Sequence, residues 1–186
     1  KAGGLSSILE NGEIDDSFSE FMLDKLFTYH GTAVGHFTGD ECLSGFSPIQ
    51  GTELCGVAEA MYSYEVLYAF TKNPIWADRL EKLAYNAFPA TITPDMWAHQ
   101  YDQMTNQIAC VRLERPIFRT NSGESHLYGL EPNFGCCTAN FNQGWPKFAM
   151  STFMKSDDGV TVCALAPAVL NTAVNGKAVK IEADTL

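Results

Sequence analysis

Two cysteines stand next to each other at Cys136 and Cys137, and this pair restricts how the chain can fold more than any other feature. Neighbouring Cα atoms are about 3.8 Å apart, whereas disulfide-bonded cysteines prefer about 5.5 Å, so a bond between these two thiols would be strained. A second element, Glu53 and Cys55, lies far upstream. Adding its carboxylate and thiol to the pair makes four ligands, the number that zinc prefers. If these residues share a metal ion, the fold brings two distant stretches of the chain together.

Both elements are predicted to lie at the start of a helix. Glu53 and Cys55 open the helix predicted over residues 53–71, and Cys136 and Cys137 come just before another predicted helix. Helix N-termini stabilise anionic groups and lower the pKa of thiols. Two such starts facing each other would assemble the four side chains around one Zn²⁺. The alternative is that these cysteines are small buried apolar residues, because free cysteine is commonly buried.

Composition and charge restrict the classes of function. The chain has 186 residues, of which 46% are hydrophobic and 18% charged, a balance typical of a globular chain with a core. The net charge of -10 argues against a nucleic-acid or anionic-membrane surface, since both need basic patches. No apolar run approaches the roughly 20 residues that span a bilayer. The balance suits neutral ligands, and sugars are among these.

The six cysteines do not suggest a disulfide scaffold in a chain of this size. Their clustering favours metal binding or catalysis under reducing conditions. A cytoplasmic location is therefore favoured, although export stays open. The chain begins with Lys1 rather than Met, and its opening residues lack the apolar core of a signal peptide. We expect it to be part of a longer protein.

Apolar periodicity predicts helices over residues 17–29, 53–71, 74–88 and 139–154. Asn73 and Pro74 are typical of an N-cap and a first helical position, and the short joint before them predicts an antiparallel helix pair. Pro146 is expected to kink the last helix or to mark its start. The stretch 30–53 is rich in Gly, Ser and Thr, and a loop of this length is uncommon in a compact domain unless it is functional.

The second half of the chain is expected to be less regular. Residues 89–132 read as long loops with one short strand over 108–113. After residue 157 the pattern changes from helical to strand-like, and Asn175-Gly176 between alternating apolar residues predicts a β-hairpin. We therefore predict a domain boundary near residue 157.

Three motifs, GDECLSG (39–45), GTELC (51–55) and GCCTAN (135–140), occur in this order. With the helical stretch between them, the chain resembles glycoside hydrolase family 127 and its relatives, which include β-L-arabinofuranosidases, over most of residues 29–170. The resemblance implies a mainly α fold. Residues 1–156 would be the C-terminal part of an (α/α)6-barrel catalytic domain, and 157–186 the start of a β-sandwich domain. Missing parts of the same polypeptide would then be partners that cover its apolar faces.

The same resemblance implies a site and an activity. The implied zinc ligands are Glu53, Cys55, Cys136 and Cys137. Cys136 would also be the nucleophile, and Glu41 would be the acid/base, with Asp40 as a second candidate. A retaining glycosidase needs these two groups on opposite sides of the anomeric carbon. The implied substrates are β-L-arabinofuranosides or related plant-cell-wall sugars. His30 and His36 flank the glycine-rich loop and are candidates for binding sugar hydroxyls, with loop histidines facing water as the alternative.

Two other functions stay open at this level. The four ligands can form a structural zinc-binding module that only ties two helices together, without catalysis. The chain can also be a thiol hydrolase that needs no metal. The zinc-dependent glycosidase would react through one thiol with an electrophilic sugar analogue, whereas a structural module would unfold on losing zinc.

Overall fold

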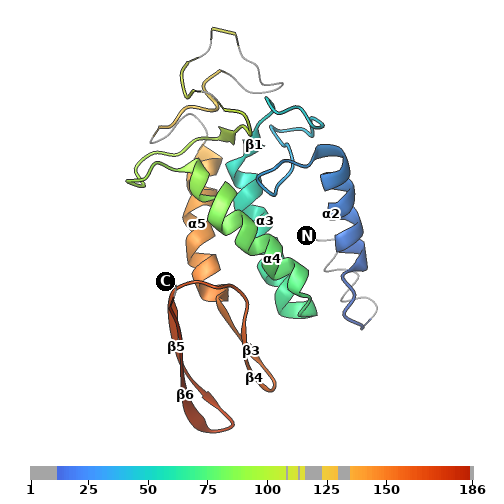
Figure 1. Cartoon of the computed structure of the whole chain (residues 1–186), viewed down its shortest axis with the longest axis vertical. Helices are drawn as coiled ribbons and strands as arrows, with labels where there is room; N and C mark the ends of the chain where they lie inside the picture. Colours follow the sequence, from blue (N-terminus) through green and yellow to red (C-terminus); the bar gives the residue numbers. More distant parts are fainter. Residues whose placement is uncertain (1–11, 108, 113, 116–122, 130–134, 185–186) are drawn as a thin grey trace.

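The computed structural model describes residues 12–107, 109–112, 114–115, 123–129 and 135–184. Helices lie in the middle, with loops at one end and β-hairpins at the other (Figure 1). The α-helices are α2 (Ser17–His30), α3 (Leu54–Thr71), α4 (Pro74–Lys82) and α5 (Gly135–Ser151), and α4 continues into a π-helical turn (Leu83–Ala87) and a 3-10 turn (Pro89–Thr91). The strand pairs are β1 (Thr52–Glu53) with β2 (Asp102–Gln103), β3 (Phe153–Ser156) with β4 (Gly159–Val162), and β5 (Ala168–Val174) with β6 (Lys177–Ala183).

These elements correct the expected fold class. The described residues form four α-helices and three separate two-stranded antiparallel sheets. An (α/α)6 barrel needs twelve helices of about 11–12 residues each, and a β-sandwich needs two larger sheets facing each other. The expectation of part of an (α/α)6 barrel followed by a β-sandwich is therefore wrong. The domain boundary near residue 157 stays a prediction. This residue lies in the turn between β3 and β4.

Helices α3 and α4 form as the sequence predicts. The buried residues of α3 recur at helical spacing, so one broad stripe of the helix faces the core; they include Leu54, Val57, Met61, Tyr64, Leu67 and Tyr68. The helix ends at Lys72, whose φ of 57° is left-handed. Asn73 then caps α4, accepting a hydrogen bond from the Ile75 amide at 3.2 Å, and Pro74 follows at the first position. The chain runs back along α3 from there (Figure 1).

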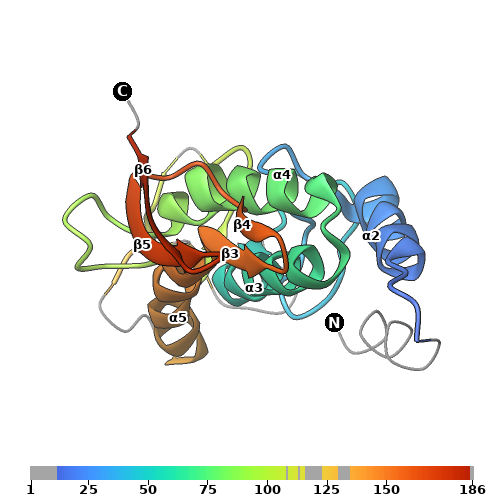
Figure 2. The same cartoon turned by 90° about the horizontal axis from the view of Figure 1, so that it is seen from below.

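Helix α2 stands on the far side of α3 and α4 from α5 (Figure 2). Its start is tied to the start of α4 by polar contacts. The Asn73 amide donates to Asp16 at 3.0 Å and to Glu20 at 2.7 Å, and the Trp76 indole donates to Asp16 at 2.6 Å. An apolar groove of about 750 Å³ lies between α2 and α3. Among the described residues, no helix has the length and apolar character to cross a membrane.

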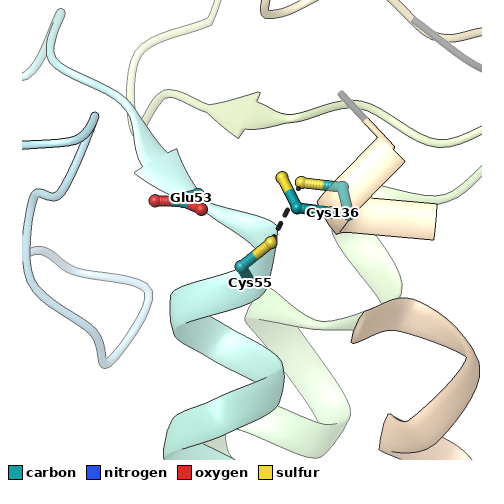
Figure 3. Close-up of side chains that lie close together, drawn as sticks. Glu53, Cys55 and Cys136 are labelled. Carbon is teal, nitrogen blue, oxygen red and sulfur yellow. Dashed lines mark hydrogen bonds between the residues drawn. The ribbon is translucent and has the colours of Figure 1, made fainter. Parts of the chain in front are cut away.

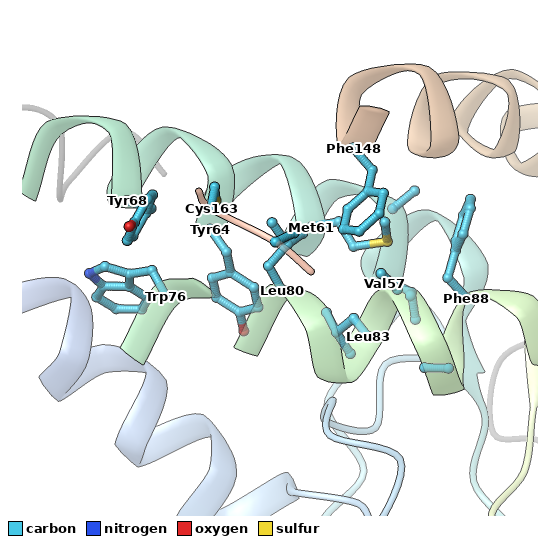
Figure 4. Packing of buried hydrophobic residues seen from close by; sticks show 14 of the residues in the cluster. Val57, Met61, Tyr64, Tyr68, Trp76, Leu80, Leu83, Phe88, Phe148 and Cys163 are labelled. Carbon is cyan, nitrogen blue, oxygen red and sulfur yellow. The ribbon is translucent and has the colours of Figure 1, made fainter. Parts of the chain in front are cut away.

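The main hydrophobic core lies where α3, α4 and α5 meet (Figure 4). Phe88 stacks on Phe141 of α5 with ring centroids 5.0 Å apart, and meets Trp145 edge-on at 5.1 Å. Gly144 permits this approach, because a Cβ atom there would lie 2.2 Å from the Phe88 ring. The packing of Phe88 therefore fixes how α5 lies against the rest of the core.

Helix α5 differs from its prediction at both ends. It begins at Gly135 rather than at residue 139, and it continues through Pro146 to Ser151. Proline removes one backbone donor inside a helix, and here the aromatic contacts on either side of it keep the helix in place. The early start puts both Cys136 and Cys137 inside the first turn instead of before it.

The C-terminal hairpin is confirmed as β5–β6. Asn175 and Gly176 have φ values of 51° and 74°, the positive angles that a two-residue type I′ turn needs. Of the thiols outside the Cys136-Cys137 pair in the second half of the chain, Cys163 is buried and Cys110 is exposed. The strand predicted over 108–113 has both end residues outside the described part of the chain, and residues 109–112 carry no strand.

We predict that Gly144→Ala destabilises the protein. Alanine favours a helix by about 1 kcal/mol over glycine, but the added methyl group would collide with Phe88. Overpacking of this kind costs about 1–3 kcal/mol. The midpoint of urea unfolding measures the change, with Asn142→Ala on the exposed side of α5 as the control that gains helix propensity without a clash. A Gly144→Ala protein as stable as this control would contradict the packing described here.

Candidate metal centre

The β1–α3 junction fixes the first two residues of the centre. Glu53 is extended, with φ -70° and ψ 134°, and it is the N-cap residue of α3. It pairs with Asp102 across the β1–β2 ladder, and the next amide, that of Leu54, donates to the Tyr101 carbonyl at 2.9 Å. These backbone bonds hold Glu53 and Cys55 at the N-terminal end of α3.

The first turn of α5 brings the cysteine pair to the same place. One ligand atom from each of Glu53, Cys55, Cys136 and Cys137 lies within 4.8 Å of every other. The Cys55 and Cys136 side chains lie between the starts of α3 and α5, with Glu53 beside them (Figure 3). The Cys55 and Cys137 sulfurs are 3.4 Å apart. We call these four residues the Glu/Cys cluster.

The Glu/Cys cluster can hold a metal ion. Sulfur atoms at the corners of a tetrahedron around a zinc-sized ion, at about 2.3 Å from it, lie about 3.8 Å apart. The spacing in the cluster is close to this. The cluster is open on one side, because Cys137 is buried and Cys136 is exposed, while the other two residues are half-buried.

When no cation is bound, one of the four groups in the cluster is ionised and the other three carry protons. A hydrogen bond from Cys137, with further ones from Cys136 and Glu53, lowers the pKa of Cys55 to about 6. Burial and the Cys55 thiolate raise the pKa of Glu53 to about 8. The hydrogen bond to Cys55 raises the pKa of Cys137 strongly, and burial raises that of Cys136. One thiolate is therefore surrounded by three protonated groups, whose protons a cation would displace.

A second glutamate lies beside the cluster. The hydroxyl of Tyr101 donates to Glu41 at 2.8 Å and also hydrogen-bonds to Glu53. Tyr101 itself is fully buried, whereas Glu41 is exposed. Glu41 has a φ of 59°, a conformation that costs a residue with a Cβ atom about 1–2 kcal/mol. A hollow of about 250 Å³ is lined by Gly39, Glu41, Cys42, Leu43 and Glu53, so both glutamates border one space.

Asp40, the second candidate for the acid/base, points elsewhere. It is fully buried and hydrogen-bonds to Asp102, which is also fully buried. Burial and the neighbouring Asp40 charge raise the pKa of Asp102 to about 10, so Asp102 is protonated at neutral pH. Asp40 does not line the hollow that Glu41 and Glu53 share. Of the two candidates, Glu41 is the one that can meet a ligand there.

The two histidines predicted to bind a sugar are not members of the Glu/Cys cluster. His30 ends α2, and its Nδ1 atom accepts a hydrogen bond from the Gly45 amide at 2.8 Å. His36 is buried against Phe37, with ring centroids 4.1 Å apart, and it borders the apolar groove between α2 and α3. Burial lowers the pKa of His36 to about 4, so it is neutral. Their contact with a sugar stays a prediction.

Two residues that complete the surroundings of the site were not assigned these roles from the sequence. These residues are Tyr101 and Asp102. Both lie in or beside β2, which consists of two residues. A strand of this length leaves no readable period in the sequence, so only its pairing with β1 reveals what these residues face.

Comparisons with protein-family models, curated proteins and solved structures find no match for this chain.

We predict that the intact protein binds one divalent metal ion at the cluster. Titration with Co²⁺ should produce a thiolate-to-metal charge-transfer absorption. Cys55→Ser and Cys137→Ser should each weaken binding by at least about tenfold, because losing a ligand costs at least as much as losing an outer partner. Cys110→Ser, an exposed thiol outside the cluster, is the matched control. Equal binding by all three variants would contradict the site.

Metal affinity should rise with pH. The cation must displace protons from groups whose pKa values are raised, Glu53 to about 8 and the two adjacent cysteines also upward. Affinity is therefore expected to weaken as pH falls below about 8. Calorimetry in two buffers of different ionisation enthalpy should register more than one proton released per metal bound. An affinity that is independent of pH would show that the ligands are already ionised.

Proposed function

We propose that this protein is a retaining glycoside hydrolase that cleaves β-L-arabinofuranosides or related plant-cell-wall sugars through a zinc-bound cysteine nucleophile. Two lines support this proposal. The three motifs of the sequence resemble glycoside hydrolase family 127 and its relatives. The residues that this resemblance makes functional, Glu41 and the Glu/Cys cluster, lie around one small region of the structure.

The exposure of Cys136 is the observation that carries the proposal. Structural zinc sites are closed by four protein ligands, so catalysis at a four-ligand site requires that one of these ligands can itself be reached by a substrate. Here Cys137 is buried, but Cys136 is open to solvent in the same cluster. Glu53 belongs to the cluster and also borders the hollow with Glu41. An accessible thiol and a second carboxyl group thus lie close to the same ligand.

Zinc is the metal that this donor set favours. Thiolates are soft ligands that select zinc over magnesium or calcium, and three thiols with one carboxylate match its four-coordinate sites. Bound zinc would keep the Cys136 sulfur ionised at neutral pH, where a free thiol is mostly protonated. The raised pKa of Cys136 in the protein alone is why such help is needed.

The residues can then divide the reaction between them in two steps. The Cys136 thiolate attacks the anomeric carbon, and a carbon–sulfur bond forms while the bond to the leaving oxygen breaks. Glu41, as a carboxylic acid, gives its proton to that oxygen. In the second step, the Glu41 carboxylate takes a proton from water, the water oxygen attacks the anomeric carbon, and the thiolate leaves. Two inversions give net retention.

Tyr101 would hold Glu41 in this scheme. Its hydroxyl has one proton and bonds to both glutamates, so it relates the position of Glu41 to that of a metal ligand. Fixing an acid within hydrogen-bond reach of the leaving oxygen is the first requirement for general acid catalysis.

A structural zinc module remains the second candidate, favoured by the way the cluster joins α3 to α5. Cys55 and Cys137 are 82 residues apart in the sequence, and a shared ion would tie them together. The two functions differ in what chelation does. In a structural module, removing the metal unfolds the protein. In the enzyme, Cys136 reacts with an electrophilic sugar while the metal is bound, and removing the metal abolishes this reactivity.

We predict that Cys136→Ser loses at least about a thousandfold in kcat on an aryl β-L-arabinofuranoside, because serine is a far weaker nucleophile without an adjacent base. An arabinofuranosyl analogue with a reactive group at the anomeric carbon should label the unchanged protein once, at Cys136, by mass spectrometry of peptides. Cys110→Ser should label normally. Turnover by Cys136→Ser, or labelling at another residue, would refute the nucleophile assignment.

A further inference from the structure

Two buried carboxyl groups, Asp40 and Asp102, form a pair that the reaction scheme does not use. Neither side chain has any exposed surface. They hydrogen-bond to each other. Two carboxylates cannot hydrogen-bond, since both are acceptors, so one of the pair carries a proton. Burying such a pair is costly unless it is satisfied, which makes its location informative. We call it the carboxyl pair.

The carboxyl pair joins the loop that carries Glu41 to the strands that carry Glu53. Asp40 directly precedes Glu41, and the amide before it, that of Gly39, donates to the Gly51 carbonyl at 3.0 Å. On the other side, Asp102 is the ladder partner of Glu53. The pair is therefore a side-chain link between the two glutamates, parallel to the link through Tyr101.

Glu41 needs such a link because its backbone is unfavourable. Its φ of 59° lies in the left-handed region, which residues with a Cβ atom rarely adopt. Left-handed residues of this kind persist where their surroundings hold them. Thr38 closes the loop on itself, since its buried hydroxyl donates to the Gly45 carbonyl at 3.0 Å. The carboxyl pair then anchors the closed loop to β2.

We infer that Asp40 and Asp102 are positioning residues that hold Glu41 in its left-handed conformation facing the hollow it shares with Glu53. This inference rests on the proposed function, because it assigns the pair to the orientation of the acid/base. Neither residue touches the reacting sugar. Their effect is expected only on the steps in which Glu41 transfers a proton.

Gly51 offers an independent way to disturb the pair. A Cβ atom at this position would lie 2.2 Å from the Asp102 carboxyl carbon and 2.3 Å from its Oδ1 atom. The Asp102 carboxyl group therefore packs directly on the Gly51 backbone. Gly51→Ala should displace this carboxyl group without removing it, and so should act like a milder Asp102→Ala.

The test compares two β-L-arabinofuranosides that differ in the leaving group. Nitrophenolate departs without needing a proton, whereas an alkyl alcohol needs the proton of the acid. In the intact protein, Asp102→Ala is expected to lower kcat/KM for the alkyl substrate by about 10- to 100-fold more than for the nitrophenyl substrate, because a misplacement of about 1 Å costs this much. Glu41→Gln should show the same selective loss, and bound zinc per chain should stay unchanged.

A conservative variant and a control complete the design. Asp102→Asn keeps a donor for Asp40, since its amide replaces the acid proton, and it should recover most of the alkyl activity lost in Asp102→Ala. Asp78→Ala, an exposed aspartate of α4, should leave both rates unchanged. If Asp102→Ala does not fold, Gly51→Ala must show the selective loss in its place.

The outcomes separate this inference from the function on which it rests. Equal losses for both substrates, loss of zinc together with activity, or Asp102→Asn as damaged as Asp102→Ala would each reduce the pair to a structural role and overturn the inference alone. Absence of turnover by the unchanged protein on both substrates, with zinc bound, would overturn the proposed function and the inference with it.

Discussion

The packing of α3 against α5 is the constraint on which the site depends. Cys55 and Cys137 come from helix starts far apart in the sequence, yet their sulfurs lie 3.4 Å apart. No local turn can produce such an approach. It follows from the core below, where Phe88 stacks on Phe141 and lies over Gly144. Protein interiors are close-packed, so a small change in the volume of one side chain shifts its neighbours. Side chains remote from the thiols therefore influence the geometry of the thiols.

The second constraint is an excess of acid in a small volume. Glu41, Glu53, Asp40 and Asp102 interact electrostatically next to three thiols, in a chain with a net charge of -10. Burial and neighbouring acidic groups are the main causes of the raised pKa values of Glu53 and Asp102. Protons hold these groups together in the protein alone. A divalent cation can replace the protons of the cluster, while the carboxyl pair, which is fully buried, keeps its own.

The sequence predicted the local structure better than the architecture. Asn73 and Pro74 marked the start of α4, and Asn175-Gly176 marked the β5–β6 turn, because both signals act within a few residues. The four members of the Glu/Cys cluster were also predicted together, from residue type and from their places at helix starts. The barrel and sandwich were expected from a resemblance, and the described helices and hairpins do not form them. The role of Asp102 and the start of α5 were not predicted, since tertiary contacts rather than local preferences fix them.

The closeness of the Cys55 and Cys137 sulfurs has a consequence for handling the protein. A disulfide bond is about 2.05 Å long, so these atoms at 3.4 Å need only a small movement to join when an oxidant removes two electrons. That bond would staple α3 to α5 and remove two of the four ligands at once. The exposed neighbouring thiol of Cys136 can attack such a bond and exchange with it. Oxidation by air would therefore remove ligands from this centre, and a metal analysis is meaningful only on protein kept reduced throughout its preparation.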